Sequence, residues 1–514
     1  MLKRIVDFSL GYRLLALVGL AIIIVLGVRA WQTVPVDAFP DVTPVQVGVV
    51  TESPGLAPAD VERLLTLPVE SSLAGLPGVR AIRSISLFGL STVTVYFEDG
   101  VDIYFARTLI NERLQQAKAR IPAGYGEPEL SPNASGLGQV FWYTVEAADE
   151  KLSDMQLRTI QDWTIRVQLR TAPGVDEVVS WGGQQMQYQV LIDPNKLIKY
   201  GIGFKEVMEA LTANNRLVGG GYLSMDREQY LVRGAGLVEQ AGDIRNIPLL
   251  TANGTSVRIG DIAEVREGGG LRPGAATRDG REVVLGMALQ RIGENAKTVT
   301  QAVREKLEAV RGTLPAGAQI DTVYDRTELV DKAVSTATRA LIEGSVLVVI
   351  VLFLFLGEMR SAIVVVLALP LAMLIAFILM QQFGLSANLM SLAGLAIGIC
   401  MMIDGAAVLV ENAYRLLSHR RDSNLSRVHI IREAAHEVVK PVAFAILIII
   451  TVFLPLFTLS DIEGKLFKPM ALSISFAMVG SLVLTLTNIP VLASFILRAK
   501  EERDSFLVRG AKRL

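Results

Sequence analysis

Long apolar runs alternate with one extended polar stretch along this 514-residue chain. Six runs have the composition of membrane-spanning helices, for which about 20 mostly apolar residues are needed. They lie at 14–28, 340–356, 362–380, 388–414, 441–459 and 470–497. Residues 32 to about 336 separate the first run from the second. This stretch has the short apolar periods of a domain in contact with water.

The first part of that domain alternates between strand and helix patterns. Every second residue is apolar in Val45–Thr51 and Ser91–Phe97, which predicts strands with one buried face. Apolar residues recur at helical spacing in Ala57–Leu73 and Val101–Arg120. The order strand, helix, strand, strand, helix predicts an α+β layer with its helices on one face.

A second unit of the same kind begins near Val140 and is interrupted by an insertion. The predicted fold is therefore an α-helical membrane domain of six spans plus an α+β domain of split βαβ (ferredoxin-like) subdomains with an inserted module. We assign 1–31 to the first membrane helix, 32–135 to the first subdomain, 136–182 and 271–336 to the second, 183–270 to the insertion, 337–498 to helices two to six and 499–514 to a linker.

Three consecutive glycines, Gly219, Gly220 and Gly221, lie inside the predicted insertion. Glycine loses more backbone entropy in a strand than other residues, so the run predicts the tip of a long loop or hairpin. A phosphate-binding loop is not indicated, because no Lys-Ser/Thr pair follows the glycines.

Basic residues indicate how the chain crosses the membrane. Lys3, Arg4 and Arg13 precede the first run, and no small-residue cleavage site follows it, so we expect an uncleaved helix. The 359–360 turn, a predicted polar loop at 415–440 and the C-terminal tail are also basic. The positive-inside rule then places both termini in the cytoplasm and the α+β domain outside, in a bacterial periplasm. The net charge of −1 argues against a nucleic-acid partner.

The fourth run carries two acids, Asp404 and Glu411. An acid at bilayer depth costs roughly 2.5–3.5 kcal/mol, so it is rare without a function. Seven residues are nearly two helical turns, which places both acids on one face about 10 Å apart along the axis. A carboxyl group held away from water can exchange a proton near neutral pH, which predicts a proton relay. In the structural alternative, Glu411 is solvated at the interface and Asp404 joins a polar helix contact.

Few residues are available as soft or imidazole metal ligands. Cys400 is the only cysteine, so an intrachain disulfide is excluded. The three histidines, His419, His429 and His436, all fall within the predicted 415–440 loop. No imidazole ligand is therefore expected along an outward path.

Three segments carry a resemblance to a known family. AIGICMMIDGAAVLVEN, PVDAFPDVTPVQV and SLFGLSTVTVYFEDGVDIYFAR are similar to sequences in the N-terminal half of resistance–nodulation–division (RND) efflux pumps, in the heavy-metal branch. The resemblance implies a transporter rather than an enzyme, without a cofactor, that exports metal cations against protons across the inner membrane. It further implies a homotrimer, a periplasmic adaptor (membrane fusion) protein and an outer-membrane channel. The insertion would be a docking module whose 219–222 segment reaches a neighbouring subunit.

Departures from the family pattern refine this interpretation. Gly405 stands where drug exporters have a second Asp, and Gly398 stands where some metal exporters have a further acid. Met390, Met402 and Met478 match membrane methionines of copper and silver exporters, whereas Leu409 and Ala493 replace two others. Thioethers favour Cu(I) and Ag(I) over Zn(II), which favours a soft monovalent ion. Methionine is also an ordinary filler of apolar cores.

The chain holds six spans, whereas the family has two six-span halves. The tail RDSFLVRGAKRL resembles the linker that leads to the second half. In the family, that half supplies a Lys partner for the relay acids and most of the metal site. The alternatives are therefore an inactive or split half that needs a partner chain, a membrane scaffold, a protein-translocation accessory, or an exporter of another small molecule.

Overall fold

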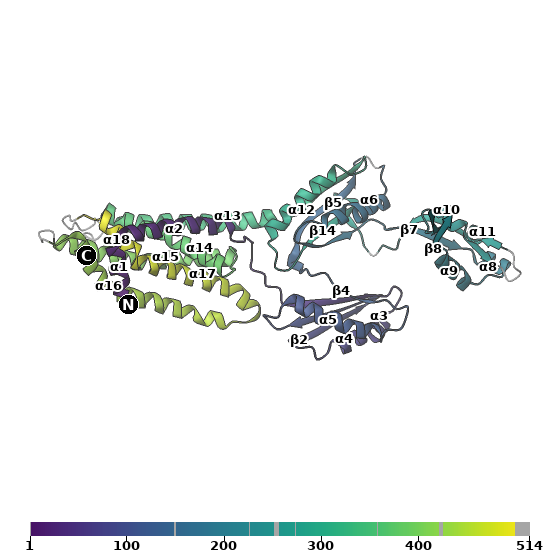
Figure 1. The fold of residues 1–514 in the computed structure, drawn as a ribbon, viewed down its shortest axis with the longest axis horizontal. Helices are drawn as coiled ribbons and strands as arrows, with labels where there is room; N and C mark the ends of the chain where they lie inside the picture. The colour runs from purple at the N-terminus through teal and green to yellow at the C-terminus, as the bar shows by residue number, and fades with distance from the viewer. Residues whose placement is uncertain are drawn as a thin grey trace.

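A long helical bundle carries α+β subdomains at one of its ends (Figure 1). The computed structural model describes residues 2–148, 151–225, 227–250, 256–272, 274–356, 358–420 and 425–498. Within them, six helices are long and apolar enough to span a membrane. They are α2 (Arg13–Thr33), α13 (Arg326–Leu356), α14 (Met359–Gln382), α15 (Leu389–His419), α16 (Arg427–Phe453) and α17 (Asp461–Leu486). The six predicted spans are thereby confirmed as apolar helices.

The first α+β subdomain holds a four-stranded antiparallel sheet. Its strands β1 (Gln46–Glu52), β2 (Val79–Leu87), β3 (Leu90–Phe97) and β4 (Pro128–Leu130) lie in the order β2-β3-β1-β4. Alternate residues of β3 are buried, including Val93, Val95 and Phe97, as the apolar alternation predicts. They pack against α5 (Ile103–Lys118) and the helical segment formed by α3 (Pro58–Val61), η1 (Glu62–Thr66) and α4 (Leu67–Leu73).

The second subdomain repeats this strand order with a long interruption. Its main strands are β5 (Gln139–Ala147), β6 (Val175–Trp181), β14 (Arg281–Gln290) and β15 (Ala318–Asp325), which pair in the order β6-β14-β5-β15, and the short strand β13 (Ala276–Arg278) also pairs with β14. The helices are α12 (Ala296–Arg311) and the run of α6 (Asp154–Ile160), η3 (Gln161–Ile165) and α7 (Arg166–Leu169). Strands β6 and β14 are neighbours, so the intervening segment leaves and re-enters the sheet at one edge.

That segment forms a small module far from the bundle (Figure 1). Strands β7 (Met186–Ile192) and β12 (Ala263–Gly269) pair and bring its two ends together. Between them lie α8 (Pro194–Tyr200), α9 (Phe204–Ala213), β8 (Arg216–Met225), β9 (Glu228–Gly236), α10 (Ala241–Arg245), β10 (Pro248–Leu250), β11 (Ser256–Arg258) and α11 (Ile259–Ile262), and β13 (Ala276–Arg278) follows β12.

The glycine run does not form the tip of the hairpin, so that prediction is wrong. Gly219, Gly220 and Gly221 lie within β8, and the turn comes later, between Met225 and Glu228. The pairing register with β9 shifts between Gly219 and Tyr222, which marks a bulge. Gly221 has φ +77 there, a conformation that glycine adopts without strain.

The predicted polar loop at 415–440 is also wrong. Helix α15 continues to His419, and α16 begins at Arg427, where Ser426 accepts a hydrogen bond from the His429 N–H. The polar residues lie on the outer faces of two helices that extend beyond their apolar parts. The many charged residues of this segment predict a loop, but the apolar positions between them keep helical spacing. Ile430, Ile431, Ala434 and Ala435 are buried on one side of α16.

Two further differences concern the ends of the chain. A short helix that was not predicted, α1 (Leu2–Gly11), precedes α2. The last predicted span is broken at Thr487, and α18 (Asn488–Ile496) follows α17. The predicted linker at 499–514 lies outside the described residues.

Candidate functional site

Helix α15 carries the predicted relay acids and begins with a well-formed cap. The Asn388 side chain accepts hydrogen bonds from the backbone N–H groups of Met390 and Ser391, both at 3.0 Å. The Asn388 N–H donates to the Ser391 hydroxyl at 2.9 Å, which completes a reciprocal capping pair. These bonds fix where the helix starts and hence the direction in which each later side chain points.

Asp404 and Glu411 lie on one exposed face of α15, as the seven-residue spacing predicts. The face comprises Ile397, Cys400, Asp404, Val408 and Glu411, and we call it the open face. In the part of the chain that the structure describes, no hydrogen bond or ion pair involves either carboxylate. The two acids are therefore available to a group that would cover this face.

A neighbouring, buried face of α15 packs very closely against α17. A Cβ atom added to Gly394 would lie 2.6 Å from the Met470 carbonyl oxygen, and one added to Gly398 would lie 3.2 Å from Ala477 Cβ. This Gly-x₃-Gly spacing allows close helix approach in membranes, and it is a signal in the sequence that the prediction did not use. Gly398, which replaces an acid of some metal exporters, is thus a packing residue in this chain.

Polar contacts fix the rotation of α15 around its own axis. The Ser481 hydroxyl of α17 donates to the Met402 carbonyl oxygen at 2.6 Å. On the other side, the Asn412 amide donates to the Ala434 carbonyl oxygen at 3.0 Å and to Glu437 Oε2 at 2.9 Å, both on α16. Asn412 follows Glu411 directly, so these bonds set the direction of the acid. A buried amide in an apolar span was the signal that could have found it.

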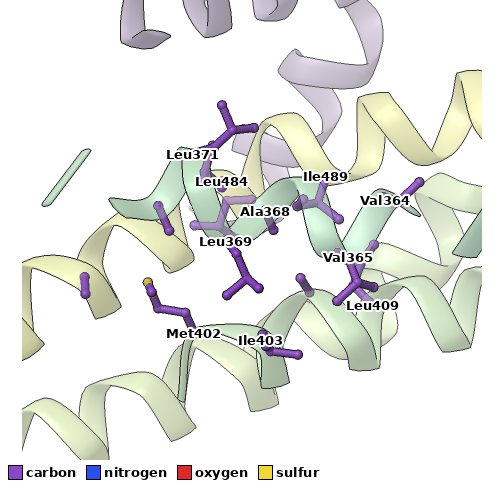
Figure 2. Packing of buried hydrophobic residues seen from close by; sticks show 14 of the residues in the cluster. Val364, Val365, Ala368, Leu369, Leu371, Met402, Ile403, Leu409, Leu484 and Ile489 are labelled. Atoms are coloured by element: carbon purple, nitrogen blue, oxygen red, sulfur yellow. The ribbon is translucent and has the colours of Figure 1, made fainter. Parts of the chain in front are cut away.

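The methionines predicted as metal contacts do not form one cluster. Met402 and Met478 are fully buried in the bundle core, where Figure 2 shows Met402 among labelled aliphatic side chains. Met390 is half-buried in the first turn of α15. Twelve residues of helix separate it from Met402, about 18 Å along the axis, so the two cannot share one ion. The described residues contain no group of three His, Cys, Asp or Glu side chains arranged for a metal.

Both α+β subdomains are attached to helices that contact α15. Strand β15 leads directly into α13, and Arg326 at this junction pairs with Asp37 at 3.1 Å. At the start of α17, Asp461 pairs with Arg80 of the first subdomain, and Lys465 lies 3.4 Å from Asp99. Both α13 and α17 pack on α15. Helix α15, which carries Asp404 and Glu411, is thus connected to both subdomains through its neighbours α13 and α17.

The β8–β9 hairpin exposes apolar side chains on a two-stranded ribbon. We call these residues the hairpin patch: Leu217, Tyr222, Leu223, Met225, Tyr230 and Leu231. Exposed apolar side chains that gather on one element are typical of a protein–protein contact.

Comparison with known proteins places this geometry in context. A profile of the AcrB/AcrD/AcrF family matches residues 5–514. The cobalt-zinc-cadmium resistance protein CzcA of Cupriavidus metallidurans is 44% identical over 100% of this chain and 49% of its own length. The cation efflux system protein CusA of Escherichia coli K12 is 38% identical over 99% of this chain and 50% of its own.

A solved structure is also similar to this chain. The crystal structure of a heavy metal efflux pump has a TM-score of 0.85 and 34% identity to this chain, covering 96% of this chain and 48% of that one. The chain spans about half the length of the curated relatives that it matches.

Proposed function

Because the chain belongs to the AcrB/AcrD/AcrF family of RND transporters, we propose that it is the N-terminal half of a proton-driven exporter of heavy-metal cations. The observation that carries the proposal is Asp404, an acid in the middle of a 31-residue apolar helix, on a face left open by the described residues. The names of the relatives support metal cations as the cargo.

The proposed cycle rests on the cost of charge in the membrane. An ionised carboxylate is costly at bilayer depth, whereas the protonated form is neutral. The ionised and the protonated form of Asp404 therefore favour different environments. Glu411 lies about 10 Å along the same face and is the second residue that we propose to bind the proton. We assign the open face to contact with the second half, where the family places a Lys partner. The rearrangement would pass through α13 and α17 to the periplasmic subdomains.

The assembly is proposed on the same basis. We propose the segment 183–270, inserted between β6 and β14, as the docking module. A homotrimer with a periplasmic adaptor protein and an outer-membrane channel follows from the family. Gly219, Gly220 and Gly221 give β8 its bulge, and the hairpin patch supplies the apolar contact with a neighbouring subunit. The bundle would lie in the inner membrane with the α+β domain in the periplasm.

Exchange of Asp404 for Asn tests the relay, because Asn keeps the shape and cannot cycle between charged and neutral forms. We expect proton-coupled metal uptake into inverted vesicles to fall to background for Asp404→Asn, with the second half present. The exposed Glu264 on β12 provides a matched control, and Glu264→Gln should transport normally. Wild-type uptake by Asp404→Asn at an equal expression level would reject the relay assignment.

The class of metal requires a separate experiment. The methionines favour a soft monovalent ion, whereas the CzcA relative is named for cobalt, zinc and cadmium. Ag(I) and Zn(II) should be titrated into the full assembly, for wild type and for Met390→Ile/Met402→Ile. A soft-ion exporter should lose at least about tenfold in Ag(I) affinity, since thioether is its preferred ligand. Tight Zn(II) binding that ignores both substitutions would leave these residues as packing only.

The second candidate is an inactive half that needs a partner chain. It is supported by the open face of α15, which the described residues leave uncovered. Metal resistance of cells that express the 514-residue chain alone separates the two candidates. Resistance would support transport by this chain, and resistance only with a second half would support the split arrangement.

A further inference from the structure

Helix α1 lies across the end of the bundle that also holds α18 (Figure 1). It packs on α16 and α18 through Val6, Ser9 and Leu10, which are buried. The chain turns at Tyr12 before α2 begins. Helix α2 has 21 residues, about 31 Å, and therefore spans the hydrocarbon core without α1. Helix α1 consequently belongs at the membrane surface.

The outer face of α1 combines aromatic and basic side chains. Phe8 and Tyr12 are 55% and 64% exposed, and their ring centroids lie 5.1 Å apart. Arg4 is exposed one turn before Phe8 on the same face, and Lys3 is exposed at the start of the helix, on the side of Asp7. An aromatic pair beside cations is typical of the boundary between headgroups and acyl chains, whereas a lipid-facing span presents aliphatic residues.

The acid of α1 is directed away from that face. Asp7 lies 2.9 Å from His436 Nε2 and 3.5 Å from Arg432 Nε, both on α16. At the junction with α2, the Arg13 guanidinium lies 5.7 Å from the ring centroid of Phe495 on α18. Pairing of Asp7 within the bundle leaves the outer face with a net positive charge.

We propose that α1 and Arg13 form a binding site for the headgroups of anionic phospholipids in the adjacent leaflet. Arg4 and Arg13 contact the phosphates, the exposed Lys3 at the start of the helix adds to the positive charge, and Phe8 and Tyr12 lie at the level of the glycerol groups. The bound lipid fixes the start of α2 against α16 and α18. This site is independent of the proposed transport cycle.

Lipid affinity tests the charges. The probe is phosphatidylglycerol added to the whole 514-residue chain in neutral detergent, with binding measured by native mass spectrometry and phosphatidylcholine as the reference lipid. Each basic residue near an anionic surface contributes roughly fivefold, so Lys3→Gln/Arg4→Gln should weaken phosphatidylglycerol binding about 30-fold. The matched control Lys196→Gln/Lys199→Gln, on the exposed face of α8, should leave it unchanged.

Two outcomes would overturn the assignment. Equal affinity for the two lipids would show that charge does not select the ligand. Displacement of phosphatidylglycerol by an equal concentration of inorganic phosphate would show a site for free phosphate rather than lipid.

The depth of α1 gives a second, independent measurement. The variant Cys400→Ser/Phe8→Cys has one cysteine, which can be labelled with a nitroxide. The labelled chain is then placed in nanodiscs that contain phosphatidylglycerol. We expect the label to be more accessible to oxygen than to a water-soluble nickel complex, as at the headgroup boundary. A control label at Ile198→Cys, which is 81% exposed on α8, should show the reverse. Equal water accessibility at both positions would contradict a surface-bound α1.

Discussion

At the scale of single residues, two glycines determine how closely α15 approaches α17. The Cβ position of Gly394 is blocked by the Ser473 hydroxyl and by the Met470 carbonyl oxygen, whereas the close neighbour of the Gly398 position is the methyl group of Ala477. A backbone atom cannot move without shifting α17, but a methyl group can be removed by substitution. The two positions therefore differ in whether a second change can restore the packing.

We expect Gly394→Ala and Gly398→Ala each to destabilise the bundle, by about 1–3 kcal/mol as is usual for overpacking. Gly398→Ala/Ala477→Gly should recover most of the loss, whereas Gly394→Ala/Ser473→Gly should not, because the Met470 carbonyl oxygen remains. Thermal unfolding of the purified chain in detergent provides the comparison. Equal rescue at both positions would mean that the backbone contact is not the obstacle.

The sequence predicted that Asp404 and Glu411 share one face of α15, but not the contacts that orient them. The two acids stand out because a charged residue in an apolar run is rare on energetic grounds alone, and their role as a relay stays a prediction. Ser481 and Asn412 are ordinary polar residues whose hydrogen bonds to Met402 and Ala434 depend on the positions of other helices. Helical spacing fixes a face within one helix, but only packing determines which neighbour that face meets.

At the scale of elements, the wrong prediction concerns a highly charged segment that is helical in the structure. The 415–440 segment was predicted as a loop because it is rich in charged residues, yet both of its ends extend transmembrane helices. The ion pair between Arg420 and Glu433 joins these extensions. Strands with strict alternation, such as β3, were predicted well, since a two-residue apolar period is specific to a strand with one buried face.

An ion pair at the edge of the second subdomain gives a prediction for pH. Arg272 donates a hydrogen bond to Glu282 on β14, and this bond lowers the pKa of Glu282 below its usual value of 4.5. The folded-state pKa is therefore below the unfolded one. The pair contributes stability above the unfolded pKa, and this contribution is lost as the pH falls through the folded pKa.

Amide exchange of the β13–β14 pair, corrected for intrinsic rates, should thus be constant from neutral pH to about 5 and should become faster as the pH falls from there through the lowered pKa. Arg272→Gln removes the hydrogen bond, so exchange should already be faster than in wild type at neutral pH and should lack this acid-dependent change. An identical pH profile in Arg272→Gln and wild type would show that this ion pair does not hold the strands together.

At the scale of the whole molecule, the six spans and the repeated subdomain were accessible from hydropathy and alternation. The arrangement of these parts was not. The attachment of α17 to the first subdomain through Arg80 and Asp461 follows only from the structure. Such contacts join residues hundreds of positions apart, for which a single sequence holds no periodic signal.

The hairpin patch gives the prediction that concerns assembly. A cysteine at Gly220 would be a poor probe, because its Cβ would lie 2.6 Å from Val232 Cγ1. Tyr222 is 70% exposed and lies opposite Leu231, so Tyr222→Cys in a Cys400→Ser background can carry a photoreactive benzophenone without strain. If the patch contacts a neighbouring subunit, irradiation in membranes should give products of two and three chain masses. A benzophenone at Ile198→Cys on α8 of the same module should give far fewer, because the probe reaches only nearby groups. If only the mass of a single chain is found at both positions, the hairpin does not contact a neighbouring subunit, and its exposed apolar residues would bind a different partner.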